Sequence, residues 1–201
     1  QLVSLKYANR DVLAQNKGLL FDNHRWIEND RFNNVSNGLE TAGEISIENK
    51  GNHYLVSTIR KGSLADQEIV YTVYGNGVLD VDVKIVPHSA DLRRAGLACA
   101  IDSSLSSVKY YALGPWENYC DRNSAVTIGR YAATVDQLAE PYIKPQTTGD
   151  RGAMRELVLE DKSGFGIKIE AEGDVAFSVN RHTDEDYMNA QHQWQLTDRP
   201  Y

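Results

Sequence analysis

The densest group of reactive side chains follows an apolar run at residues 108–113. Glu117 and Asp121 supply two carboxylates there, and Arg122 supplies a guanidinium. Glycoside cleavage needs two carboxylates about 5 to 9.5 Å apart, which makes this pair a candidate for catalysis. The adjacent guanidinium favours a structural lock, because charged groups near a core are normally paired. A sugar-facing rim is the alternative, and we assign no catalytic residue.

Two tryptophans lie close to amide or imidazole groups in the sequence. Trp26 follows Asn23 and His24, and Trp116 precedes Asn118. Aromatic rings stack on the apolar faces of sugars, whose hydroxyls then require polar partners. These residues are therefore candidates for substrate binding, and the alternative is that each ring packs at the edge of the fold.

Metal and cofactor chemistry has little support in the sequence. The five histidines are scattered, without the H-x-x-x-H or Cys-x-x-Cys spacing of a zinc site. There is no G-x-S-x-G nucleophile elbow and no glycine loop that could cradle phosphate. We expect no metal and no cofactor.

Composition sets limits on the class of protein. A chain of 201 residues with 41% hydrophobic residues suits one domain, residues 1–201. The net charge of −7 disfavours nucleic acid and anionic membranes as partners. No apolar run approaches the roughly 20 residues that span a bilayer, so we expect a soluble protein of the cytoplasm or periplasm. The first residue is glutamine, which suggests an excised fragment.

The elements that must position these side chains are mostly strands. Alternation over residues 78–86 places Val81, Val83 and Ile85 on one face, as in an antiparallel strand with one solvated side. Turn signals every 8 to 12 residues or so are typical of a sandwich or barrel. The expected strands cover residues 2–5, 44–48, 54–60, 69–74, 78–86, 108–113, 125–131, 155–160, 166–171 and 175–179.

The remaining segments include two short helices and one long loop. We expect a turn or two of helix within residues 134–140 and a helix within 183–192 that Thr183 caps. Residues 18–31 lack either periodicity and indicate a surface loop. The two cysteines, Cys99 and Cys120, do not form a disulfide framework, and we expect free thiols, with Cys99 buried.

Spaced motifs give a family resemblance. Gly-Pro-Trp-Glu-Asn-Tyr-x-Asp-Arg at residues 114–122 resembles the G-x-G-P-x-E-N-Y-x-D-R signature in the C-terminal domain of glycoside hydrolase family 2 β-galactosidases. Residues 140–157 are similar to that family's P-Y-x-x-P-Q/S-x-x-G-x-R-x-x-x-R-E/W-x-x-L pattern. The resemblance covers roughly residues 10–201. Its signature residues are Trp116, Glu117, Asn118, Tyr119, Asp121, Arg122, Arg151 and Arg155.

The resemblance implies an all-β fold, an antiparallel super-sandwich of two large sheets similar to the galactose mutarotases, with one or two short helices. It also implies that the chain stops before the family's last strands. The family carries its catalytic glutamates on a separate barrel, and no segment here alternates strands with helices as a barrel does. The chain is therefore expected to be an accessory domain of a retaining β-galactosidase, inactive alone.

Substrate contacts are also implied by the resemblance. The segment at residues 22–31 is similar to the family's R-x-P-x-D-N-D region, although the proline is missing and His24 replaces the second aspartate. Asn23, His24 and Trp26 are thus expected at the rim of the active site, and Tyr201 where the family places a stacking aromatic residue. The implied partners are the catalytic barrel and a galactoside. A carbohydrate-binding module and an aldose epimerase-like protein remain as alternatives.

Overall fold

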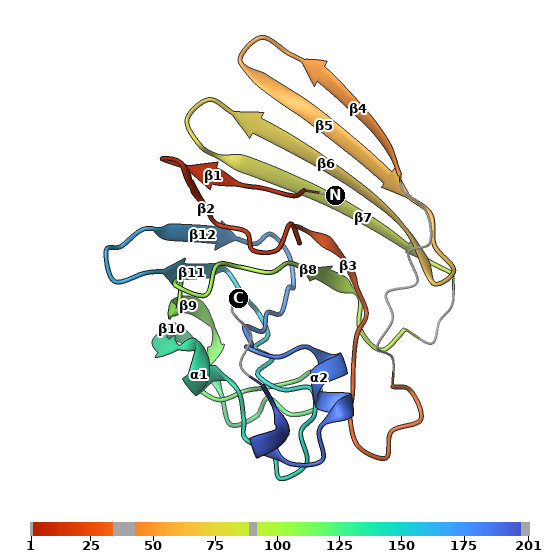
Figure 1. The fold of residues 1–201 in the computed structure, drawn as a ribbon, viewed down its shortest axis with the longest axis vertical. Coiled ribbons are helices and arrows are strands. Elements are labelled where there is room, and N and C mark those ends of the chain that lie inside the picture. The colour runs from red at the N-terminus through yellow and green to blue at the C-terminus, as the bar shows by residue number, and fades with distance from the viewer. Residues whose placement is uncertain (1, 34–42, 89–91, 198–201) are drawn as a thin grey trace.

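A computed structural model describes residues 2–33, 43–88 and 92–197 of the chain. Within these residues the strands form two four-stranded sheets and two two-stranded sheets, all antiparallel (Figure 1). The sheet of β4–β7 forms one layer at one end of the molecule, and the other sheets lie past its β7 strand. The prediction of an all-β fold with short helices is confirmed.

The first large sheet is a meander of four consecutive strands. Its strands are β4 (Glu44–Asn49), β5 (His53–Arg60), β6 (Ala65–Tyr74) and β7 (Leu79–Pro87). The alternation predicted all four, although β6 begins four residues before the expected start at residue 69. The register sets Val56 opposite Tyr71, and Tyr71 opposite Val81, so apolar residues gather on one face.

Burial on that face falls toward the β4 edge. On β6, Ala65, Ile69 and Tyr71 are buried. On β4, Ile45 and Ile47 are 62% and 67% exposed. The apolar face of this sheet is therefore covered only in part by the described residues.

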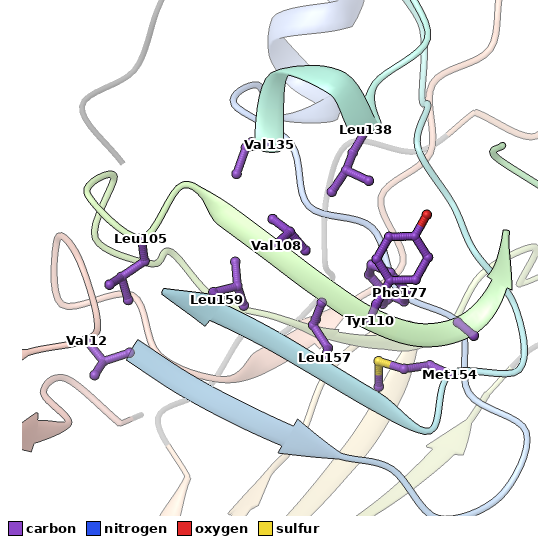
Figure 2. Packing of buried hydrophobic residues seen from close by; sticks show 11 residues of the cluster. Val12, Leu105, Val108, Tyr110, Val135, Leu138, Met154, Leu157, Leu159 and Phe177 are labelled. Carbon is purple, nitrogen blue, oxygen red and sulfur yellow. The ribbon is translucent and has the colours of Figure 1, made fainter. Parts of the chain in front are cut away.

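The second large sheet has the strand order β10-β9-β11-β12. Its strands are β9 (Ser107–Gly114), β10 (Thr127–Thr134), β11 (Glu156–Glu160) and β12 (Gly166–Glu170). Side chains of β9 and β11 meet those of helix α1 (Val135–Leu138) in the main hydrophobic core (Figure 2). Residues of this core include Val12, Leu105, Val108, Tyr110, Val135, Leu138, Met154, Leu157, Leu159 and Phe177.

Four short strands form two further small sheets beside the two large ones, and the sequence did not predict them. Pairing joins β1 (Lys6–Tyr7) to β2 (Arg10–Asp11), and β3 (Leu20–Asp22) to β8 (Gly96–Ala98). The prediction of a strand at residues 2–5 is wrong, because the β1–β2 pairing begins at Lys6 and encloses the turn after Tyr7. The surface loop expected at 18–31 is wrong in its first part, because residues 20–22 pair with β8 and Phe21 is buried.

Both predicted helices are present, while the last predicted strand is not. Helix α2 (Asp184–Asn189) begins after Thr183, whose hydroxyl accepts a hydrogen bond from the Asp186 N–H. Residues 193–195 add a 3₁₀ turn. The strand expected at 175–179 is wrong. Its Phe177 makes one isolated bridge to Arg151, and the positive φ of 51° at Ala153 keeps that neighbouring segment from continuing the ladder.

A cleft of about 2920 Å³ runs between the layers. Apolar side chains of β7 and β12 line one part of it, and polar residues near His24 and Asp184 line another. Both cysteines are free thiols as predicted, but Cys99 is exposed rather than buried, because it lines this cleft. Among the described residues, no helix has the length and apolar character needed to cross a membrane.

Candidate functional site

Glu117 occupies the centre of the loop that follows β9. Its side chain is 4% exposed. One carboxylate oxygen, Oε2, accepts hydrogen bonds from the Gly149 N–H at 2.8 Å and from Thr148 Oγ1 at 3.0 Å. The other oxygen, Oε1, accepts from Arg122 and from the Tyr142 hydroxyl. The Tyr119 hydroxyl also donates to Oε2 at 3.5 Å, so five donors from three segments converge on one buried carboxylate.

These contacts set the charge state of Glu117. Burial alone would raise the pKa of its carboxyl group, but the hydrogen bonds from Tyr142, Gly149, Thr148 and Arg122 outweigh burial and lower the pKa below its usual value. The carboxylate therefore stays ionised at neutral pH, with its lone pairs occupied. A general acid needs a proton to give, which this arrangement opposes.

Asp121 and Tyr119 complete the turn around Glu117 in different ways. Backbone bonds in both directions join Tyr119 to Arg122, and the guanidinium lies 5.2 Å from the Tyr119 ring centre. Burial raises the pKa of the Tyr119 hydroxyl. Asp121 is exposed, and its carboxylate has no hydrogen bond within the described chain. The second carboxylate of the candidate catalytic pair thus lies apart from the buried cluster.

Asn118 connects the signature loop to residues 150–152. It is 1% exposed. Its backbone N–H donates to the Asp150 carbonyl at 2.8 Å, and its side-chain oxygen accepts from the Gly152 N–H at 2.9 Å. Its amide nitrogen donates to the Trp116 carbonyl at 3.1 Å. The Asn118 side chain is therefore hydrogen-bonded to backbone groups in the interior, and it does not lie beside the exposed Trp116 ring.

The two arginines of the downstream motif differ in environment. Arg151 is 2% exposed and donates to the carbonyls of Gly149, Leu138 and Pro115 at 2.8 to 3.1 Å. Arg155 is exposed and donates to the Tyr111 hydroxyl at 2.7 Å. Arg151 therefore links its own segment to the end of helix α1 and to the loop after β9, whereas Arg155 contacts the surface of β9.

Hydrogen bonds to Thr147 hold the segment that follows β3. The Trp26 N–H donates to Thr147 Oγ1, and the Thr147 N–H donates to the Trp26 carbonyl, both at 2.7 Å. Further along, Ile27 exchanges two bonds of 2.7 Å with the Asn33 side chain. The loop therefore has a fixed path, and the Trp26 ring is half-buried with its Nε1 lacking a hydrogen-bond partner in the described chain.

A charged cluster lies where this segment begins. Asp22 is buried, and its carboxylate lies 3.2 Å from His24 Nδ1 and 3.7 Å from Arg94 Nη2. Asn23, next to it, is 5% exposed. Of the predicted substrate-binding residues, His24 and Trp26 are partly exposed, while Asn23 lies inside. Tyr201 lies outside the described residues.

Two further carboxyl groups face the same cluster. Burial raises the pKa of Asp150 to about 6, and the charge of Glu117 adds to the shift, while Arg94 and Arg151 oppose it. Burial also raises the pKa of Asp184, which accepts a hydrogen bond from Thr147. Asp150 can therefore both donate and accept a hydrogen bond at a pH near 6.

Sequence reasoning missed several members of these networks. Tyr142, Thr147 and Thr148 lie within the motif at residues 140–157, which gave them no role, and Arg94 and Asp184 come from two other segments. A threonine pair followed by glycine at 147–149 is the one local sign of a carboxylate-binding turn. In the described ranges, no three His, Cys, Asp or Glu side chains are grouped as metal ligands would be.

Comparisons with known proteins agree with the sequence motifs. The whole chain, residues 1–201, matches the family model described as the β-galactosidase small chain. A β-galactosidase of Lactobacillus delbrueckii subsp. bulgaricus is 32% identical across 97% of this chain, and one of Streptococcus thermophilus is 34% identical across 50%. One of Halalkalibacterium halodurans is 24% identical across the full chain.

The matched regions cover 21%, 10% and 21% of these three relatives, so the chain spans about a fifth of a β-galactosidase or less. The match over the full chain shows the family: the chain belongs to the β-galactosidase small-chain family.

Proposed function

We propose that this chain is a non-catalytic domain of a glycoside hydrolase family 2 β-galactosidase that cleaves terminal β-D-galactosides. It packs against the catalytic barrel and contributes residues 23–31, together with Tyr201, to the rim of the active site. Its substrate is bound between the two domains, and the glutamates that break the bond lie on the barrel.

The ordered loop at residues 23–33 is the observation that carries this proposal. Thr147 pairs with the Trp26 backbone, and Arg25 forms an ion pair of 2.8 Å with Asp30. His24 keeps a third of its side chain exposed, at 33%. A loop whose backbone is fixed and whose aromatic and imidazole groups remain accessible suits recognition of a sugar.

Glu117 supports the non-catalytic part of the proposal. Its carboxylate is saturated with donors, and its lowered pKa suits a charge that holds loops together. Asp121, the other member of the candidate pair, is exposed and makes no hydrogen bond to the buried cluster within the described residues.

Activity assays test the proposal directly. The purified chain should not hydrolyse a chromogenic β-galactoside above a blank, and mixing it with the separately expressed catalytic portion of its parent should restore hydrolysis. Hydrolysis by the chain alone that disappears in Glu117→Gln would overturn the proposal.

A variant pair tests the role of the loop in the reconstituted enzyme. Trp26→Ala should lower kcat/KM about tenfold, because losing one ring contact should weaken transition-state binding by about 1.4 kcal/mol. Trp194→Ala is the matched control, because the Trp194 ring is 79% exposed and lies in the 3₁₀ turn instead of the loop. Equal effects of the two substitutions would contradict a rim position for Trp26.

A further inference from the structure

The Trp116 ring is held at the surface by a fixed backbone. Trp116 is 65% exposed, whereas the next residue, Glu117, is buried. The carbonyl of the preceding residue, Pro115, accepts a hydrogen bond from Arg151 at 3.0 Å. The carbonyl of Trp116 itself accepts from Asn118. A single exposed ring is ordinary on a protein surface, so its meaning depends on what lies beside it.

Beside the ring is a concavity of about 400 Å³. Trp116, Ala125 and Val126 give it an apolar wall, and Arg122, Glu140 and Tyr142 contribute polar groups. This volume lies within the range of small-molecule sites, roughly 300 to 1,000 Å³. A ring on one side and charged hydrogen-bonding groups on the other match the two surfaces of a pyranose.

The polar groups of the concavity are positioned by the buried network. Arg122 uses Nη2 for Glu117 and for the Tyr142 hydroxyl, the latter at 3.1 Å, which fixes the guanidinium while Nη1 and Nε keep their capacity to donate. The Glu140 N–H donates to Thr148 Oγ1 at 2.8 Å, which fixes the backbone of Glu140. A donor and an acceptor on fixed supports can bind neighbouring hydroxyls of one ring, because each hydroxyl both donates and accepts.

The charges at the concavity select a neutral ligand. Arg122 contributes one positive charge, and Glu117 and Glu140 contribute two negative charges. The net negative charge disfavours a phosphorylated or carboxylated sugar.

From this geometry we propose that the concavity between Trp116 and Tyr142 is a binding site for a neutral pyranose. It would stack the sugar on Trp116 and hold its hydroxyls between Arg122 and Glu140. The site involves none of residues 23–31 and is independent of the function proposed above.

Nuclear magnetic resonance of the ¹⁵N-labelled chain provides the test, since the three tryptophans give three indole N–H signals. Methyl β-D-galactopyranoside and methyl β-D-glucopyranoside are titrated separately, and glycerol serves as a non-pyranose polyol. The Trp116 signal should shift saturably with a glycoside, at a dissociation constant of about 1 mM or weaker for so small a contact. The Trp194 signal, from the most exposed of the rings, should not saturate.

Substitutions separate binding from folding. Trp116→Ala should abolish saturable binding, Glu140→Gln should weaken it about tenfold through loss of a charge-assisted hydrogen bond, and Trp194→Ala should leave it unchanged. The dispersion of backbone amide signals reports whether each variant is folded. The proposal is overturned if the Trp116 signal stays fixed with both glycosides, which leaves the ring as a protein contact, if glycerol gives the same response, or if folded Trp116→Ala still binds.

Discussion

The two four-stranded sheets share an antiparallel pattern but differ in what covers them. In the β10-β9-β11-β12 sheet, Val108, Leu157 and Leu159 are at most 5% exposed and pack with helix α1 (Figure 2). In the β4–β7 sheet, Ile47 on the edge strand is 67% exposed. Alternating residues make both sheets, whereas burial depends on neighbours that come from elsewhere in the chain.

The buried sheet also carries the polar networks. The loop after β9 contains Glu117, and the segment before β11 contains Arg151. The meander contributes no residue to either network. The Glu117 and Arg151 networks are thus attached to the buried sheet, whereas the proposed rim residues follow β3 of a small separate sheet, and this difference leads to the following expectations.

Arg151→Met should have the largest effect. The substitution removes the donor of two buried carbonyls and of the partly buried Pro115 carbonyl, and should lower the free energy of unfolding by about 3 kcal/mol or more. Urea unfolding measures the change. Arg155→Met is the control, because that exposed guanidinium contacts one hydroxyl and its loss should cost about 1 kcal/mol. Similar losses for both variants would contradict the role given to Arg151.

Glu117→Gln should lower the free energy of unfolding by about 2 kcal/mol at pH 7, since it weakens several charge-assisted hydrogen bonds. The folded pKa of Glu117 lies below its unfolded value, so its contribution is present above that unfolded value and is lost as pH falls through the folded pKa. Wild type and variant should therefore converge in acid. A constant difference from pH 7 to low pH would exclude this linkage.

Asp150→Asn should act in the opposite direction. With a folded pKa of about 6, raised from an unfolded value of about 3.9, the wild type loses stability as pH rises from about 4 to 6. The asparagine variant should not show this loss, and should be more stable by about 1 kcal/mol above pH 6. Melting temperatures between pH 4 and 7 measure it. A variant less stable than wild type at pH 7 would count against a buried, poorly compensated carboxylate.

Ile47→Ser should have the smallest effect, within about 0.5 kcal/mol, because the side chain is mostly in solvent. Leu159→Ala, at an equally regular strand position with 3% exposure, should lower the free energy of unfolding by about 2 to 5 kcal/mol. Equal losses in urea unfolding would show that the two sheets are covered alike.

The sequence predicted the long strands because alternation and turn residues are local signals. It did not predict the pairing of β3 with β8, since residues 20–22 and 96–98 lie far apart and each segment is only three residues long. The strand expected at 175–179 shows the reverse: local β propensity is present, but the neighbouring segment is irregular at Ala153.

The candidate site was predictable only where it was continuous in sequence. Glu117, Asn118 and Arg122 were identified from one motif. The cluster of Asp22, Arg94, Thr147 and Asp184 was not, because its members meet through tertiary folding.

Residues 147–149 contact both the loop that carries Trp26 and the turn that carries Glu117. Thr147 binds the Trp26 backbone and Asp184, while Thr148 and Gly149 bind Glu117. Gly149 has a φ of +83°, a left-handed conformation that glycine adopts without strain, so the chain turns directly after these contacts. The Trp26 backbone and the Glu117 turn that carries Trp116 are therefore anchored on the same three residues.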